Sequence, residues 1–176
     1  MRYFSGKGDS GETNLFDGRK VSKDDPILEL IGTTDELRAQ IGLAISLTIQ
    51  SDIKKTLRLV QITLSKIMGL IAGAEGSSIG DLDIPNGIIG LEEVIDNYGH
   101  KLDPVEGFNF SGKTTSGAAI DLCRVMARKA ERRALTYIRE NKLLDQDIIA
   151  YLNRLSSLFY VFSLFVDQTI NIDHVK

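Results

Sequence analysis

Basic and acidic side chains crowd one stretch of this sequence, residues 124–133 (RVMARKAERR). Four of them fall at i, i+4, i+7 and i+8, so a helix would carry them on one face over two turns: Arg124, Arg128, Glu131 and Arg132. Guanidinium groups at this spacing can hold a triphosphate bidentately, and the glutamate can orient one arginine or bind a ribose hydroxyl. The pattern predicts an anion site, with a merely solvated charged face as the alternative.

A second polar segment lies at residues 5–13 (SGKGDSGET) and combines three glycines with hydroxyls, a lysine and an aspartate. Backbone N–H groups of such a segment can surround phosphate, while Asp9 binds a magnesium ion or a hydroxyl. A flexible terminus is the alternative. Asp35, in the stretch GTTDEL at 32–37, is the third candidate: it either caps a helix or pairs with an arginine across a bundle interface.

Five helices are expected to position these groups, and no stretch makes a convincing strand. Apolar residues recur at three- and four-residue steps from Pro26 onward, and the residues at 33–36 either cap or kink this first helix. The later helices are expected at 51–73, 87–98, 115–141 and 145–170. Short connections at 50–52 and 141–145 favour antiparallel neighbours, so the predicted fold is an all-α bundle.

The last expected helix has a wider apolar face than one core stripe needs. This face indicates either a subunit interface or burial within one bundle. Its members are Leu152, Leu155, Leu158, Phe159, Phe162, Leu164 and Phe165.

The stretch 107–114 (GFNFSGKT) fits the phosphate-binding pattern GxxxxGK[ST] letter for letter. A true P-loop follows a buried strand, and the preceding residues 97–106 (NYGHKLDPVE) are too polar and too broken to form one. Bulky Phe108 and Phe110 also suit a tight phosphate loop poorly. The match is therefore interpreted as a coincidence.

Composition bounds the remaining classes. The 176 residues carry a formal net charge of −3, which argues against a general nucleic-acid binder. Cys123 is alone, so it forms no intrachain disulfide, and it is expected to be a small packing residue. His100 and His174 lack spaced partners for a metal site. With no signal sequence and no apolar run of about 18 residues expected, the chain is predicted to be cytoplasmic, with no membrane partner.

Taken together, these segments resemble the PduO-type ATP:corrinoid adenosyltransferases. The loop GKGDSGET with Lys23 is similar to the family's ATP-wrapping segment, and GTTDEL to one of its helix starts. RVMARKAERR resembles its arginine-rich signature, and LNRLSSLF at 152–159 resembles its terminal motif. The matches keep their order over nearly the whole chain, which makes the set fairly specific.

The resemblance implies one domain over 1–176, with an ATP-binding loop at 1–26 and a five-helix, ferritin-like bundle at 27–171. It implies a homotrimer with active sites between subunits. The implied reaction moves the 5′-deoxyadenosyl group of ATP, with Mg²⁺, to the cobalt of a reduced corrinoid and releases triphosphate. A flavoprotein reductase and a B12-dependent client enzyme are the implied partners. The alternative is a non-catalytic helical module that binds ATP or corrinoid as a chaperone or sensor.

The resemblance also assigns roles to single residues. Those implied to hold ATP phosphates and magnesium are Ser5, Gly8, Asp9, Gly11, Thr13 and Lys23, with Asp9 at the metal. Those implied to bind ATP from the helices are Arg128, Glu131, Arg132 and Asn153. Asp35 and Arg124 would form an intersubunit salt bridge, and Phe108 would sit against the corrin and displace the lower axial ligand. The family pattern is broken at Lys129 and Ser157, and also in the 108–114 loop.

Overall fold

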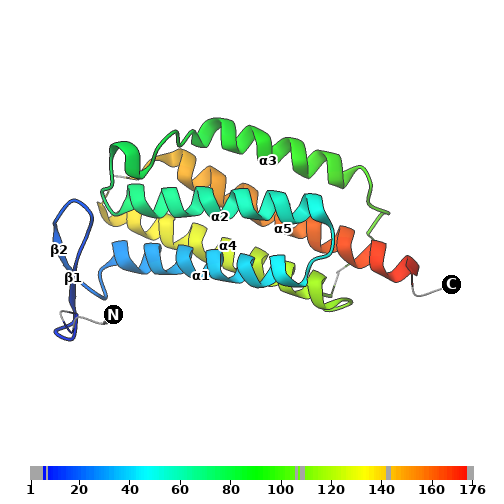
Figure 1. The fold of residues 1–176 in the computed structure, drawn as a ribbon, viewed down its shortest axis with the longest axis horizontal. Helices are drawn as coiled ribbons and strands as arrows, with labels where there is room; N and C mark the ends of the chain where they lie inside the picture. The colour runs from blue at the N-terminus through cyan, green and yellow to red at the C-terminus, as the bar shows by residue number, and fades with distance from the viewer. Residues whose placement is uncertain (1–5, 7, 106, 108–109, 142–143, 174–176) are drawn as a thin grey trace.

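The structure, a computed structural model, describes residues 6, 8–105, 107, 110–141 and 144–173. Over these residues the chain forms five α-helices, a short 3-10 turn and one two-stranded hairpin (Figure 1). The elements are β1 (Glu12–Asn14), β2 (Lys20–Ser22), α1 (Pro26–Leu47), α2 (Ser51–Ile71), η1 (Gly76–Ser78), α3 (Ile84–Gly99), α4 (Thr115–Asn141) and α5 (Gln146–Asp173). The predicted all-α bundle is confirmed.

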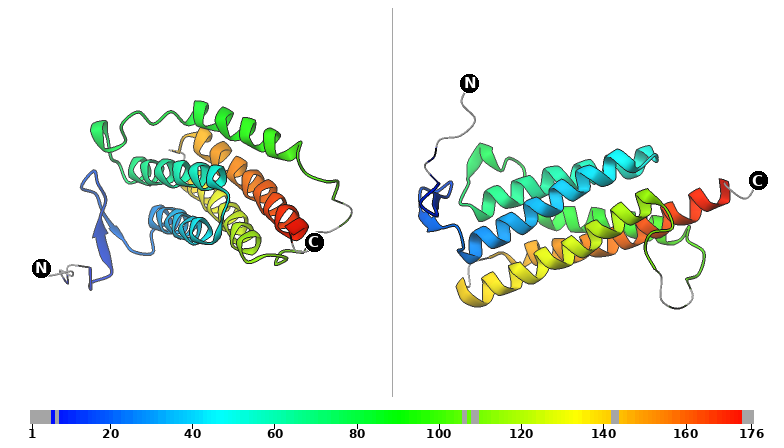
Figure 2. Two further views of the ribbon diagram at one scale, coloured as in Figure 1. Left: turned by 45° about the vertical axis from the view of Figure 1, so that its right-hand side comes forward. Right: turned by 90° about the horizontal axis from the view of Figure 1, so that it is seen from below.

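The helices run side by side along one long axis (Figures 1 and 2). α4 packs against both α1 and α5, while α2 covers α1 and α3 covers α5. The hairpin lies at the end of the bundle where α1 begins and α4 ends, and the connection from α3 to α4 lies at the opposite end (Figure 1). This separation of the two irregular segments governs where a site can form.

Helix starts follow local capping. The Asp25 carboxylate accepts a hydrogen bond of 2.9 Å from the Ile27 N–H, and Pro26 occupies the first turn, so α1 begins there. The residues at 33–36 therefore lie inside α1, and the prediction that they cap its start is wrong. Asp83 caps α3 through the Asn86 N–H at 3.0 Å, which starts that helix three residues before the predicted 87.

α5 is the central core helix. Its wide apolar face is buried inside the bundle, which decides between the two interpretations: Leu152, Leu155, Leu158, Phe159 and Phe162 are fully buried. The stretch Gln146–Thr169 is also long and apolar enough to cross a membrane. The expectation of no such run is therefore wrong, although most of the stretch is buried against the other helices, as in the core of a soluble protein.

The hairpin corrects the expectation that the chain has no strand. β1 and β2 pair antiparallel with Thr13 opposite Val21. Their connection is closed by the Leu15 N–H, which donates to the Arg19 carbonyl at 2.9 Å, and Gly18 takes the left-handed φ of 85° that this turn requires. Buried Leu15 and the Phe16 N–H, which donates to Ala72 at 2.9 Å, attach the turn to the end of α2.

Candidate functional site

The arginine cluster lies on α4 as predicted. The side chains of Arg128 and Arg132 are exposed and form no hydrogen bond or ion pair with any part of the chain that the structure describes. Arg133, by contrast, pairs with Glu29 of α1 at 3.1 Å, and Lys129 pairs with Glu36 at 2.7 Å. Folding therefore uses the cations that face α1 and leaves two guanidinium groups available to an anion.

A polar chain of contacts borders these two arginines and links three helices. The Asn153 side-chain amide of α5 donates to the Glu131 carboxylate of α4 at 2.9 Å. The side-chain oxygen Oδ1 of Asn153 accepts from Arg154 at 3.1 Å, and Arg154 in turn donates to Glu92 of α3 at 2.6 Å. The structure thus brings together the predicted residues Glu131 and Asn153 and fixes their orientation.

Asp35 and Arg124 have other partners within one chain. Arg38 donates to the Asp35 carboxylate at 2.8 and 3.0 Å, and Arg124 donates to the Asp121 carboxylate at 2.6 Å. The bond to Asp121 raises the pKa of Arg124, against the smaller opposing effect of burial. Each pair joins residues three apart on one helix. The intersubunit bridge stays a prediction, and it would require both groups to exchange or share these partners.

The predicted ATP-wrapping segment folds back on the open end of the hairpin. The Lys23 ammonium donates to the Gly8 carbonyl at 2.6 Å, and the Lys23 backbone N–H donates to the Gly11 carbonyl at 2.8 Å. Gly11 has a φ of 80°, and Asp9 is exposed while Thr13 is half-buried. The structure thus joins Lys23 to Gly8 and Gly11. Ser5 and Phe108 lie outside the described residues.

Magnesium would have to be shared with a phosphate. Among the residues that the structure describes, no group of three or more His, Cys, Asp or Glu side chains could hold a metal ion. A single exposed carboxylate such as Asp9 fits Mg²⁺ that takes its other ligands from water and substrate phosphates, which is the usual arrangement for this ion. The residues present therefore fit a metal that arrives with its nucleotide.

The residues that match the GK[ST] end of the phosphate-binding pattern, Gly112 to Thr114, precede a helix and do not follow a strand in the described part of the chain. No strand precedes them in the described part of 100–113, and Thr114 instead caps α4. Its hydroxyl accepts from the Gly117 N–H at 2.9 Å and donates to Asp167 of α5 at 2.6 Å. The P-loop interpretation is excluded. Asp167 itself was not predicted, although an acidic residue inside the apolar run LFVDQT signals a buried partner.

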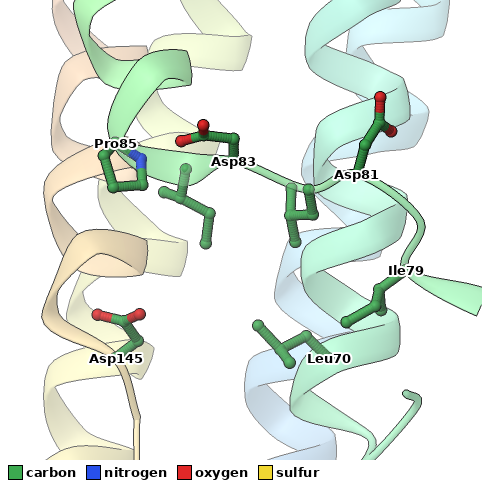
Figure 3. Close-up of a pocket in the computed structure, with 8 residues that line it drawn as sticks. Leu70, Ile79, Asp81, Asp83, Pro85 and Asp145 are labelled. Carbon is green, nitrogen blue, oxygen red and sulfur yellow. The ribbon is translucent and has the colours of Figure 1, made fainter. Parts of the chain in front are cut away.

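A cavity of about 480 Å³ lies at the hairpin end of the bundle between α2, α3 and the start of α5 (Figure 3). Leu70 and Ile79 line it together with three carboxylates, those of Asp81, Asp83 and Asp145 (Figure 3). Asp83 and Asp145 cap α3 and α5, and Asp81 pairs with Lys66 at 2.8 Å. This acidic cavity is unsuited to a triphosphate, so the arginine face of α4 remains the candidate site.

Comparison with known proteins gives the family. The profile for cobalamin adenosyltransferase matches residues 3–166. The chain belongs to the cobalamin adenosyltransferase family. A corrinoid adenosyltransferase from Citrobacter freundii is 31% identical over 170 residues, covering 90% of this chain and 91% of that relative. The corrinoid adenosyltransferase MMAB of Bos taurus is 31% identical over 170 residues, covering 93% of this chain and 69% of the relative.

Solved structures agree with the sequence match. A phenylalanine-to-alanine variant of the PduO-type ATP:corrinoid adenosyltransferase from Lactobacillus reuteri, complexed with cobalamin and ATP, has a TM-score of 0.87 at 25% identity. The match covers 97% of this chain and 96% of that chain. An arginine-to-lysine variant complexed with ATP has a TM-score of 0.86 at 27% identity, covering 96% and 95%. The predicted family, fold and enzyme class, an ATP-dependent corrinoid adenosyltransferase of the PduO type, are confirmed.

Proposed function

We propose that this chain transfers the 5′-deoxyadenosyl group of ATP to the cobalt of a reduced corrinoid and releases triphosphate. The observation that carries the proposal is the pair of exposed guanidinium groups, Arg128 and Arg132, in a chain of this family. Arg128 contacts the phosphates, with Arg132 beside it, while Glu131 and Asn153 hold the nucleoside end. Developing negative charge on the leaving triphosphate is then neutralised by groups already in place.

The chemistry requires no nucleophile from the protein. The reduced cobalt attacks the ribose C5′, the C5′–O bond breaks, and its electron pair leaves with the triphosphate. Cys123, the only thiol in the chain, is buried, and burial raises its pKa to about 12, so it does not compete as a nucleophile. The protein's tasks are positioning and charge stabilisation.

The proposed residue roles require more than one chain. The hairpin and the described part of the α3–α4 connection lie at opposite ends of the bundle (Figure 1). α4 has 27 residues and therefore spans about 40 Å. Because cobalt and C5′ must come within bonding distance, the hairpin of one copy has to meet the opposite end of another.

We propose a homotrimer that builds the site in this way, with Asp35 of one copy bridged to Arg124 of the next. Exposed apolar side chains on three neighbouring helices support such an assembly: Leu43 and Leu47 on α1, Leu59 and Ile62 on α2, and Leu122, Val125 and Leu135 on α4. The proposal includes one domain over 1–176, a cytoplasmic location, a flavoprotein reductase that supplies reduced corrinoid, and a B12-dependent client that takes the product.

The test is the reaction itself. Purified chain is mixed with ATP, Mg²⁺ and chemically reduced cobalamin, the adenosylcobalamin spectrum is followed, and the phosphate products are identified by phosphorus NMR. We expect adenosylcobalamin and triphosphate in equal amounts. Binding of ATP and cobalamin without a cobalt–carbon bond would instead identify a chaperone or sensor module.

A further inference from the structure

Arg154 on α5 contacts two residues with its guanidinium group. Its Nε atom donates to the Glu92 carboxylate of α3 at 2.6 Å, and a second nitrogen donates to Oδ1 of Asn153 at 3.1 Å. Successive residues of a helix point about 100° apart, so helix geometry alone does not bring the side chains of Asn153 and Arg154 together. The bond to α3 holds the guanidinium group in the position from which it reaches Asn153.

The side-chain amide of Asn153 is held at both ends. Its nitrogen donates to Oε1 of Glu131 on α4 at 2.9 Å, while its oxygen accepts from Arg154. A guanidinium group only donates and an ionised carboxylate only accepts, so both partners require the same orientation of the amide. Glu131 alone would fix one end and leave the amide free to turn about that bond. Arg154 therefore determines where the rest of the amide points.

One donor and one acceptor of this pair remain available to a ligand. The Asn153 amide has two N–H bonds, of which Glu131 takes one, and the second has no partner among the residues that the structure describes. The other oxygen of Glu131 likewise bonds to nothing in the described part of the chain. A hydroxyl group can donate to a carboxylate and accept from an N–H at the same time, so the pair suits a hydroxyl.

The surroundings of this pair indicate which hydroxyl it suits. Arg128 and Arg132 lie within one turn of Glu131 on α4, and their exposed guanidinium groups suit phosphates. A hydroxyl site beside a phosphate site matches a sugar that carries phosphates. In ATP this sugar is ribose, with hydroxyls at C2′ and C3′.

We propose that Glu92 and Arg154 position Asn153 so that it binds one ribose hydroxyl of ATP together with Glu131. The inference rests on the proposed function, in which Glu131 and Asn153 hold the nucleoside end. An amide that is already oriented in the free protein does not have to be ordered when the nucleotide binds. Glu92 and Arg154 are thus positioning residues, and α3 takes part in nucleotide recognition through them.

Arg154→Met removes the donor and keeps most of the apolar stem, while Arg154→Lys keeps a group that only donates. Arg133→Met is the matched control, because the side chains of the Arg154–Glu92 pair are 40% and 44% exposed and those of the Arg133–Glu29 pair are 46% and 49% exposed. Glu92→Ala releases Arg154 from α3. Its control is Glu93→Ala, the neighbouring exposed carboxylate, which has no partner in the described chain.

The measurement is the Kd of ATP, 2′-deoxyATP and 3′-deoxyATP, each with Mg²⁺, by isothermal titration calorimetry on the full chain. We expect the wild type to bind one of the two deoxy analogues about tenfold or more weakly than ATP, because the analogue leaves a charged hydrogen-bonding group unpaired.

Arg154→Met should raise the Kd of ATP by about tenfold and leave that of the discriminated analogue within about twofold, so the ratio of the two Kd values falls toward one. Glu92→Ala should change the ratio in the same direction by a smaller factor. Arg154→Lys should keep most of the wild-type ratio, and both controls should keep all of it.

A merely structural role gives a different pattern, in which ATP and both analogues lose affinity by the same factor. That pattern in folded Arg154→Met or Glu92→Ala overturns the inference, and so does a wild type that binds both analogues as tightly as ATP. Glu92→Ala decides the matter even where Arg154→Met does not fold.

The same titrations separate this inference from the proposed function. A wild type that shows the expected ratios but forms no adenosylcobalamin overturns the proposed reaction and leaves the positioning role supported. An active wild type whose variants keep the wild-type ratio overturns the positioning role alone. A wild type that does not bind ATP overturns both.

Discussion

The two faces of α4 differ in the size, burial and charge of their side chains. The inner face is made mostly of small residues that are almost completely buried: Ala119, Cys123, Ala127, Ala130 and Ala134. The outer face carries Arg128 and Arg132, which are exposed and find no partner among the described residues. Small side chains let the neighbouring helices approach closely, so the inner face serves packing.

This difference separates the residues that packing requires from those that it does not. Substituting the inner face should change stability and leave chemistry intact in whatever folds. The outer arginines contribute little to folding, because an exposed cation without a partner gains almost no interaction energy. An anion that binds to them would explain their presence, and the following substitutions test that division.

Arg128→Ala is expected to have the largest effect. Loss of the phosphate contact should lower kcat/KM for ATP by about 10²-fold or more, because the transition state loses a charge-stabilising group. The urea midpoint should stay at the wild-type value, since the guanidinium has no partner in the described fold. Steady-state kinetics measure the loss of kcat/KM, and equilibrium unfolding of the same preparation measures the urea midpoint. Near-normal turnover would remove Arg128 from the site.

Ala127→Leu tests the inner face. Ala127 is fully buried, so the larger side chain must displace α1 or α5 at a cost of about 1–3 kcal/mol. Urea unfolding measures this loss of stability. The remaining folded protein should retain ATP affinity, because the outer arginines are unchanged. A wild-type unfolding midpoint would show that the helices are less tightly packed than the burial indicates.

High pH tests the same face without a mutation. Burial raises the pKa of Cys123 from 9.0 to about 12, so the folded chain keeps a proton that the unfolded chain loses. Stability should be complete below pH 9 and fall by about 1.4 kcal/mol per pH unit from there toward pH 12. Urea unfolding between pH 8 and about 11 measures the slope.

The matched control for the pH slope is Cys123→Ala. Tyr151, whose pKa burial also raises to about 12, continues to contribute above pH 10 in that variant. The slope between pH 9 and 10 should therefore nearly disappear when the thiol is removed. An unchanged slope would show that another group causes the alkaline loss.

Asp35→Asn, on α1, probes the proposed contact between α1 of one copy and α4 of another. Its own-chain pair with Arg38 is half-exposed, so losing it should cost less than about 1 kcal/mol. If Asp35 also bridges to Arg124 of another copy, turnover should fall several-fold and the assembly should dissociate at higher protein concentration than the wild type. Sedimentation and kinetics measured together decide this, and unchanged values in both would exclude the bridge.

Arg133→Ala should have the smallest effect and serves as the control for Arg128. Arg133 pairs with Glu29 near the surface, and such pairs contribute about 0–1 kcal/mol. We expect a small decrease in stability and wild-type turnover. A large loss of activity would place the functional face of α4 toward α1 instead of toward solvent.

Much of the helical architecture was available from the sequence. α4 was predicted with its observed bounds because it is a long stretch with helical periodicity. The hairpin was missed because strands of three residues are too short to show alternation, although Asp17-Gly18 is a turn signal. α3 began early because Asp83 and Pro85, which resembled loop residues, cap and initiate the helix.

The site was only partly predictable. The spacing of Arg128 and Arg132 placed both on one face, and the structure adds that neither is used in folding. The bond between Glu131 and Asn153 joins residues of different helices, so no local pattern encodes it. Asp167 lies 53 residues from Thr114 and acts only through the tertiary packing of α5 on α4. Local rules recover elements and faces, while contacts between elements require the folded chain.

The placement of the hairpin and the α3–α4 connection at opposite ends of the bundle (Figure 1) has a genetic consequence. If every site takes its hairpin from one copy and its loop from another, an allele damaged at one end can complement an allele damaged at the other. In a cell that expresses both alleles equally, about a quarter of the sites in a closed ring would combine two intact ends. Two alleles damaged at the same end would restore none.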